Sequence, residues 1–292
     1  MVNWKSNGAE IRSYTDETGK VKSRPQNESV FFKEGVTYSA SGSKGPSYRL
    51  LPEGCIFDVG GSCIFPIKKY KNTAYILAFF NSTFSKYVVE CLNPTVNKQV
   101  GDIERLPFAI PAAHHESQIS ELSLRNIAIT SLLDRFNLYE SEFTKSPLEG
   151  RATIDWRNAI TEYLNYENHL RAQVLLNEAI INETIYEVYA LTEADKSMVI
   201  AKEGQSIGGL RVLSEAKAAY LKESSCMGEY SLENIKQFIE SLPECQFSAE
   251  EQQAVESGLG ALYQNNNDLE EFCIRHQINP INVWFWLKQR PV

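Results

Sequence analysis

This sequence lacks the patterns that place a chain in a membrane or around a structural zinc ion. Its 292 residues hold no uninterrupted apolar stretch near the roughly 20 residues that a membrane-spanning helix needs. The chain does not open with a charged segment followed by an apolar one, as a secretory signal would. No two of its six cysteines form a CxxC pair, which argues against zinc: Cys55, Cys63, Cys91, Cys226, Cys245 and Cys273. We therefore expect a soluble, cytoplasmic protein.

Histidine is also scarce, and this weakens any prediction of catalysis. The chain has four histidines, of which His114 and His115 adjoin Glu116. Side chains at neighbouring positions point in different directions, so these three do not form a convergent metal set. His169 and His276 lie inside helical patterns, and no Ser/His/Asp or Cys/His arrangement stands out. The sequence predicts neither a metal site nor a catalytic residue.

The charges are divided unequally along the chain. Residues 1–115 contain 14 Lys and Arg against 10 Asp and Glu, whereas residues 116–292 contain 15 against 27. A basic segment beside an acidic one fits a nucleic-acid face attached to a solvated or protein-contacting scaffold. A net charge of +4 over 115 residues is mild, so this asymmetry only supports other evidence.

The length and the patterning predict two domains. From residue 23 to residue 65, short apolar runs such as VTYSA, YRLLP and SCIF are broken by Gly, Pro and Ser, which is typical of strands and turns. The run YILAFFNSTFSKYVVECL, residues 75–92, is long enough for one amphipathic helix on that sheet. The Pro-punctuated segment IERLPFAIP then ends the first domain, which we place at residues 1–115.

Residues 116–292 are predicted to be mainly helical, because apolar residues recur there three and four positions apart. The expected helices cover residues 119–136, 154–189 and 231–242, with a helical pair over 269–287 that is broken at Asn279 and Pro280. This last pair has helix-turn-helix spacing, but Trp284, Phe285 and Trp286 stand where a major-groove reader shows polar side chains. The pattern favours a packing or protein-docking pair over direct DNA reading.

The segment NPTVNKQVGDIERLP, residues 93–107, begins like the catalytic turn of an adenine methyltransferase. Such a turn needs an aromatic residue that stacks on the flipped base, and Thr95 and Val96 stand in place of the second proline and the aromatic. IFDVGGS could supply a Gly-rich cofactor loop, but too few residues follow it for a doubly wound sheet. We expect no catalysis by this chain alone.

The same segment can be interpreted in two other ways. Asn97 and Gln99 are amides that could pair with adenine edges, and Lys98 could contact phosphate. The alternative is a turn in which these side chains cap local backbone groups. Basic and aromatic residues also interleave through the first domain, which suits either DNA contact or an ordinary sheet surface: Lys20, Lys22, Arg24, Lys33, Tyr38, Lys44, Tyr48, Arg49, Lys68, Lys69, Tyr70 and Lys71.

Several segments, taken in order, resemble one family. They are NWKSNGAEI, VFFKEGVTYS, YRLLPEGCIFDVGGSCIF, the run from YILAFF to DIERLP, and LLDRFNLYESEFTKSPL, with a thinner match over NEAIINETIYEVYAL. They look like the region that follows the catalytic domain in large adenine-specific DNA methyltransferases. The family is that of the PglX-like enzymes of BREX phage defence, together with the related type IIG restriction-modification enzymes. Most of residues 192–292 have no counterpart in this resemblance.

The resemblance implies a fold and a role. It implies an α/β (α+β) target recognition domain with a curved sheet and flanking helices over residues 1–115. A helical spacer and a C-terminal helical domain would follow over residues 116–292. The family's cofactor loop and NPPY motif belong to a preceding domain and match no position here, so S-adenosylmethionine and catalysis are assigned to a separate domain or chain.

The resulting hypothesis is that this region selects the DNA sequence that an N6-adenine methyltransferase modifies. Basic side chains would hold phosphates and polar side chains would read base edges of double-stranded DNA. The phosphate candidates are Lys22, Arg24, Lys44, Arg49, Lys68, Lys69 and Lys98, and the base-edge candidates are Tyr48, Asn97 and Gln99. The alternative hypothesis is a scaffold that docks other defence-system subunits without touching DNA.

Overall fold

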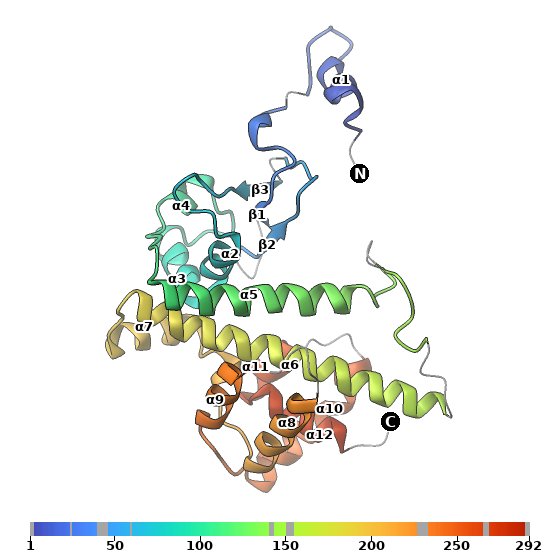
Figure 1. The fold of residues 1–292 in the computed structure, drawn as a ribbon, viewed down its shortest axis with the longest axis vertical. Helices are drawn as coiled ribbons and strands as arrows, with labels where there is room; N and C mark the ends of the chain where they lie inside the picture. Colours follow the sequence, from blue (N-terminus) through green and yellow to red (C-terminus); the bar gives the residue numbers. More distant parts are fainter. Residues whose placement is uncertain are drawn as a thin grey trace.

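The protein is mainly helical and carries one small sheet (Figure 1). The computed structural model describes residues 3–23, 25–39, 46–58, 60–139, 143–149, 155–226, 233–264 and 269–289. Within these residues there are 12 α-helices and a three-stranded antiparallel sheet that is not curled. The expectation of a curved sheet is therefore wrong. The glycine, proline and serine that interrupt residues 23–65 leave only short strands. No helix among the described residues is both long and apolar enough to cross a membrane.

The sheet has the strand order β2-β1-β3. Its strands are β1 (Gly35–Ser39), β2 (Tyr48–Leu51) and β3 (Gly61–Ile64). Three of the predicted apolar runs thus form strands. Two further apolar runs of residues 23–65 form no strand: Ser29 and Val30 of SVFF (residues 29–32) belong to the 3-10 turn η1 (Glu28–Val30), and CIFDV (residues 55–59) runs without strand pairing over its described residues. One aromatic cluster occupies this region in their place, with ring centroids 5.2 Å apart for Trp4 and Phe31 and 5.4 Å apart for Phe31 and Phe57.

The single helix expected over residues 75–92 is instead two helices, α2 (Thr73–Asn81) and α3 (Thr83–Leu92). Ser82 separates them in an extended conformation, where its Oγ accepts the Ser85 N–H at 3.1 Å. A serine that caps a new helix competes with continuation of the old one. The apolar α2 is buried on nearly every side because it lies between the sheet and α5 (Ala113–Asp134).

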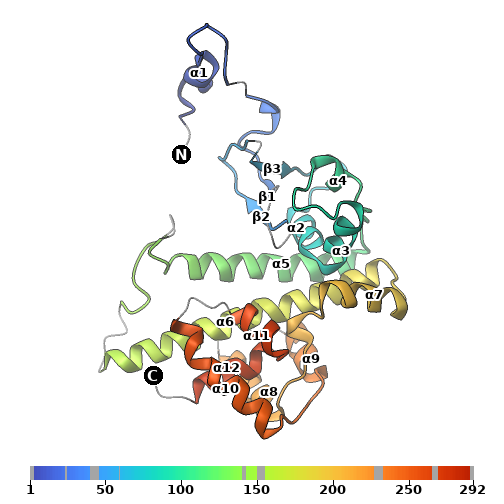
Figure 2. The same cartoon turned by 180° about the vertical axis from the view of Figure 1, so that it is seen from behind.

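The two long helices that the spacing predicted lie antiparallel in the middle of the molecule (Figure 1). They are α5 and α6 (Trp156–Val188). The sheet, α2, α3 and the short α4 (Val100–Glu104) lie on one side of this pair, and the C-terminal helices lie on the other (Figures 1 and 2). The short N-terminal helix α1 (Lys5–Ser13) projects beyond the sheet, away from α6.

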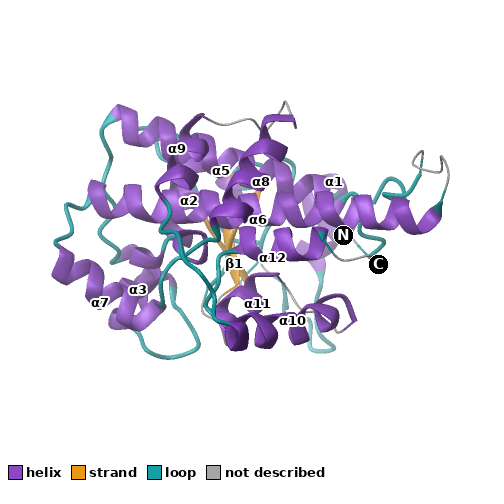
Figure 3. Cartoon of the chain, turned by 90° about the horizontal axis from the view of Figure 1, so that it is seen from below, coloured by secondary structure: helices purple, strands orange, loops and turns teal. Residues whose placement is uncertain are grey.

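The remaining helices follow α6 in the chain; most pack against its second face or against one another, whereas α7 packs against α3. They are α7 (Glu193–Glu203), the 3-10 turn η2 (Ile207–Gly209), α8 (Ser214–Cys226), α9 (Glu233–Ser241), α10 (Ala249–Gln264), α11 (Leu269–His276) and α12 (Pro280–Lys288). Seen from below, the small sheet lies behind this helical layer (Figure 3). The predicted third helix and the C-terminal pair are confirmed.

The α12 helix belongs to the core. Trp284 is fully buried, and its ring meets Tyr220 edge to face at a centroid distance of 5.2 Å. Asn282 is also buried, and its Nδ2 donates to the Arg211 carbonyl at 3.1 Å. Gln277 takes the left-handed turn position, with φ at 53°, that a glycine usually fills. This helix is not available to a DNA groove, in agreement with the prediction of a packing pair.

The first 115 residues and the helical half are joined through polar contacts as well as packing. The Tyr189 hydroxyl accepts the Ala109 N–H at 2.9 Å and also bonds the Pro107 carbonyl. Asn182 Oδ1 accepts the Thr83 N–H at 2.9 Å. One continuous cluster of buried side chains runs from Val36 to Leu287. The predicted boundary at residue 115 falls inside α5, and the division into two domains stays a prediction.

Candidate nucleic-acid interface

One face of the sheet is covered, and the other is exposed at Arg49. Antiparallel pairing places Arg49, Thr37 and Cys63 in one row, because Thr37 lies opposite both of the others. The neighbouring row contains Tyr48 and Tyr38, which are buried against α2. Successive side chains of a strand point to opposite faces. Arg49 therefore lies on the face opposite these tyrosines and is exposed.

Tyr48, predicted to contact base edges, lies on the covered face and is 5% exposed. Its ring packs between Tyr38 at 5.3 Å and Phe80 at 5.0 Å, measured between centroids. Burial, with a smaller contribution from Tyr38, raises the pKa of the Tyr48 phenol above its ordinary value. In this arrangement Tyr48 is a core residue and does not reach a ligand on the face of Arg49.

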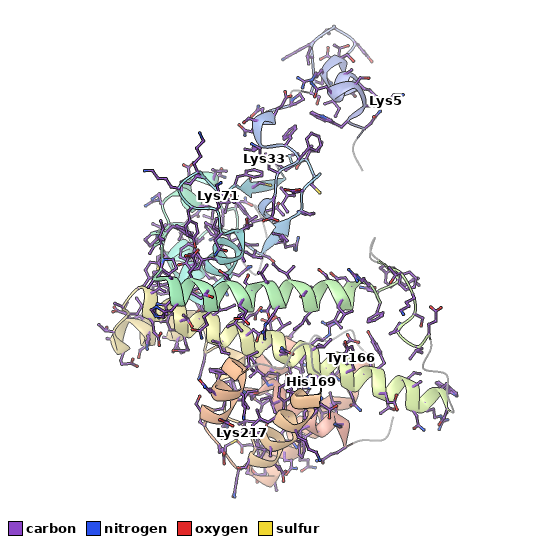
Figure 4. All side chains as sticks on the ribbon, in the orientation of Figure 1. Lys5, Lys33, Lys71, Tyr166, His169 and Lys217 are labelled. Carbon is purple, nitrogen blue, oxygen red and sulfur yellow. The ribbon has the colours of Figure 1, made fainter. Side chains whose placement is uncertain are left out.

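The exposed cations of the first 71 residues differ from those of the helical half. Eight of them have no carboxylate within 4.0 Å among the described residues. They are Lys5, Lys20, Lys22, Lys33, Arg49, Lys68, Lys69 and Lys71. Figure 4 labels three of these side chains, Lys5, Lys33 and Lys71, on the part of the molecule that carries α1 and the sheet.

In the helical half, by contrast, five exposed cations have no such partner among the described residues, namely Arg135, Lys145, Arg157, Lys202 and Lys236, and seven have a carboxylate within that distance. The pairs are Arg125–Glu121, Arg171–Glu167, Lys196–Glu193, Arg211–Glu251, Lys217–Glu244, Arg275–Glu271 and Lys288–Glu223. A cation that is already paired has less to gain from a phosphate than an unpaired one. Among the described residues, most of the cations before residue 72 are therefore unpaired, whereas most of those in the helical half are paired.

Four of the predicted phosphate residues belong to this unpaired set: Lys22, Arg49, Lys68 and Lys69. Arg24 and Lys44 lie outside the described residues. Lys5 was missed by the sequence argument, and Lys20, Lys33 and Lys71 were noticed there without being chosen. These four lysines share one feature, which is that no acidic side chain lies close enough to pair with them. Distances between side chains depend on the fold, so the sequence alone does not show this feature.

Lys68 and Lys69 occupy a turn closed by mutual backbone bonds between Ile67 and Tyr70, at 3.1 and 3.0 Å. The Tyr70 hydroxyl donates to Glu116 Oε1 at 2.9 Å. The same Glu116 oxygen accepts Asn72 Nδ2 at 2.8 Å. Burial, and then the bond to Glu116, raises the Tyr70 pKa. The two lysines are thus presented on a turn that is fixed to α5.

Lys98 differs from the other phosphate candidates because it is 2% exposed. Its ammonium lies 2.7 Å from Glu90 Oε1 and donates to the carbonyl oxygens of Asn93 and Thr95. The ammonium thus closes the turn that follows α3 and faces the protein. This geometry favours the interpretation of residues 93–99 as a local turn over that of a DNA-facing loop.

Asn97 and Gln99 are exposed, and their backbone atoms carry the turn. The Asn97 carbonyl accepts Asn93 Nδ2 at 3.0 Å, and the Gln99 N–H donates to Asp102 Oδ2 at 2.9 Å. Asn93 and Asp102 supply capping side chains of this turn, and Gln99 is the N-cap of α4, in a capping box with Asp102. The bonds to Asn93 and Gln99 lower the Asp102 pKa. The amides of Asn97 and Gln99 stay accessible to solvent.

The residues that could have formed a methyltransferase cofactor loop do not fit that role. Asp58 Oδ1 accepts the Gly60 N–H at 2.9 Å and the Gly61 N–H at 3.3 Å, which closes the loop on itself. The loop leads into β3, whereas a Gly-rich phosphate or cofactor loop opens a helix. The described residues contain no group of three or more His, Cys, Asp or Glu that could hold a metal ion.

The histidines have structural neighbours. His115 Nε2 lies 3.4 Å from Glu187 and so bridges α5 and α6. His169 is buried and stacks on Tyr220 at a centroid distance of 4.3 Å, and burial lowers its pKa to about 4. Both positions belong to helix packing, so neither joins the exposed cations described above.

Comparison with known proteins found two similar methyltransferases and no matching family model. Adenine-specific methyltransferase BrxX of Escherichia coli O9:H4 (strain HS) is 29% identical over 192 residues, which are 64% of this chain and 15% of the relative. Adenine-specific methyltransferase PglX of Lacticaseibacillus casei (strain Zhang) is 29% identical over 201 residues, 66% of this chain and 16% of the relative. The chain thus spans about a sixth of each relative, and it is homologous to one part of the PglX and BrxX adenine-specific methyltransferases.

Proposed function

We propose that this chain is the DNA-recognition region of an N6-adenine methyltransferase of BREX phage defence or of type IIG restriction-modification. The single observation that carries the proposal is the set of eight exposed cations between Lys5 and Lys71 that have no carboxylate partner among the described residues, in a chain whose net charge is −8. Phosphate contacts supply most of the sequence-independent affinity for a duplex, and they need cations without competing carboxylates. Homology to adenine-specific methyltransferases points to DNA as the polyanion.

In this proposal the chain binds and orients DNA, and the chemistry takes place elsewhere. Lys22, Arg49, Lys68 and Lys69 contact phosphates, while the exposed amides of Asn97 and Gln99 are the base-edge candidates that stay accessible. The bonds from Tyr70 and Asn72 to Glu116 fix the lysine turn relative to α5. S-adenosylmethionine and the flipped adenine are held by a separate catalytic domain, and this chain alone is expected to bind no S-adenosylmethionine.

The test is the salt dependence of duplex binding. Replacing Lys22, Arg49, Lys68 and Lys69 with alanine should lower the slope of log K against log salt by up to about 3.6, at about 0.9 for each lost phosphate contact. The matched control replaces four ion-paired cations of the helical half, Lys196, Arg211, Arg275 and Lys288. An equal slope change in both variants, or unchanged affinity in the first, would contradict the proposal.

A second candidate function is a docking module for other defence-system subunits. The observation in its favour is a pair of exposed aromatic side chains: Tyr139, in the α5–α6 connection, is 94% exposed, and Trp156, the first residue of α6, is 67% exposed. Aromatic residues are enriched in protein interfaces. If docking is the main function, replacing Tyr139 and Trp156 with serine abolishes capture of a partner subunit while the lysine variants retain it.

A further inference from the structure

Phe32 adopts a backbone conformation that phenylalanine rarely takes. Its φ angle is 64°, in the left-handed region, where the Cβ of any residue except glycine comes too close to its own carbonyl oxygen. The conformation is held on both sides, because the Phe32 N–H donates to Cys55 at 2.9 Å and its carbonyl accepts the Gly54 N–H at 3.1 Å. The fold therefore maintains a disfavoured geometry at this residue.

The consequence of this geometry is an exposed ring beside a buried one. Phe31 is buried, whereas Phe32 is 44% exposed. The ring of Phe32 is supported from one side by Trp4, at a centroid distance of 6.0 Å and an interplanar angle of 69°. The ring also meets the buried Phe31 edge to face, at a centroid distance of 6.3 Å. The strained backbone thus presents a large apolar ring, braced by two other aromatic rings, on the surface.

The neighbourhood of this ring is suited to a nucleic acid. Lys33 follows it directly and Lys5 follows Trp4, and both lysines are exposed members of the unpaired set (Figure 4). Proteins that kink or unstack DNA combine phosphate-binding cations with an apolar side chain inserted at a base step. Residues held in rarely populated backbone conformations cluster at ligand-binding positions.

We propose that Phe32 stacks on, or inserts beside, an unstacked base of the DNA that this chain binds. The inference rests on the proposed function and adds one contact to it. A ring that fills the space left by an unstacked base lowers the free energy needed to unstack that base. That contact would favour DNA in which a base has left its stack, which is the state that an adenine methyltransferase needs. It is independent of the phosphate contacts, which do not distinguish stacked from unstacked bases.

The experiment compares two duplexes of equal length that differ at one position of one strand, so that one is fully paired and the other holds a single mismatched, unpaired base, by fluorescence anisotropy with the full chain. The wild type should bind the second duplex about 5- to 100-fold more tightly, the range expected for one base–aromatic stack. Phe32→Asn should abolish this preference, since asparagine tolerates the left-handed conformation and removes the ring. Phe32→Tyr should keep it.

Tyr14→Ala is the matched control, because Tyr14 is another exposed aromatic residue of the same region. Circular dichroism on each variant verifies the fold. If the wild type binds paired duplex without preferring the unpaired base, or if Phe32→Asn keeps the preference, this inference alone is overturned. If the wild type binds neither duplex, the proposed function fails together with it. A Phe32→Asn defect limited to protein capture also overturns the DNA contact.

Discussion

The phenol of Tyr70 donates a 2.9 Å hydrogen bond to Glu116 Oε1, and this bond ties the turn of Lys68 and Lys69 to the first turns of α5. Asn72 Nδ2 approaches the same oxygen and also donates to Ser120 Oγ at 2.9 Å. Glu116 is therefore the common acceptor where the sheet region meets the long helices.

Replacing Glu116 with alanine should lower the free energy of unfolding by about 1–3 kcal/mol, because a half-buried phenol and amide lose their shared acceptor. Urea denaturation followed by circular dichroism measures the change. The control is Glu271→Ala, whose exposed pair with Arg275 should be worth at most about 0.5 kcal/mol. Equal losses in the two variants would mean that the Glu116 network does not hold the joint.

Lys98 and Lys68 should respond in opposite ways to alanine. Lys98→Ala removes a buried ammonium from Glu90 and two carbonyl oxygens and should lower the free energy of unfolding by about 2 kcal/mol. It should leave the salt slope of DNA binding unchanged. Lys68→Ala should change stability by less than about 0.5 kcal/mol and lower the slope by about 0.9.

These two lysines also show how far the sequence could lead. Both stand in polar, turn-like segments, and both were predicted to contact phosphate. Whether a lysine in such a segment points to solvent or back into its own turn depends on the carbonyl groups around it. Here the helix end at Leu92 and the start of α4 at Val100 bring those carbonyls together. A salt slope that falls for Lys98→Ala would restore the original prediction.

The long helices were predictable for a different reason. Apolar residues that recur at helical spacing over many turns, as in α5 and α6, predict an amphipathic helix, and the structure confirms both helices. The run over residues 73–92 is apolar on most sides, so its periodicity did not reveal the break. That break depends on Ser82, whose local hydrogen bond begins a new helix. The size of the sheet was not predictable from strand patterns alone, because pairing of distant segments decides it.

His169 should make the protein less stable in acid. Its pKa is lowered to about 4 by burial from an ordinary value of about 6.5. Between those two pH values the unfolded chain binds the proton and the folded chain does not. Stability is therefore fully retained above pH 6.5 and falls as the pH drops, by about 3 kcal/mol at pH 4. His169→Phe keeps a ring on Tyr220 without the titrating group.

Urea midpoints measured from pH 7 to pH 4 test this prediction. The wild type and His169→Phe should diverge as the pH falls, with the variant losing less stability. The other acidic and histidine groups titrate in both proteins and cancel in the difference. Parallel curves would show that His169 takes up its proton in the folded state as readily as in the unfolded state, which would contradict the prediction.

Tyr48 and Arg49 are neighbours on β2, and their side chains point to opposite faces of the sheet. Substitutions at the two positions should therefore have opposite effects on stability and on DNA binding. A strand pattern alone does not tell which of two adjacent residues faces the core, since a shift of one residue reverses both. Packing of Tyr48 between Tyr38 and Phe80 settles the direction. The Tyr48 hydroxyl is buried and has no hydrogen-bond partner among the described residues.

Tyr48→Phe should therefore keep stability or raise it by up to about 1 kcal/mol, because an unsatisfied buried hydroxyl costs free energy. DNA affinity should not change. Arg49→Ala should do the reverse, with little effect on unfolding and a salt slope lower by about 0.9. Denaturation and salt titrations on the two single variants decide the matter. A clear loss of DNA affinity in Tyr48→Phe would return this hydroxyl to the base-contacting set, because the substitution removes only the hydroxyl and would weaken binding only if that group contacts DNA.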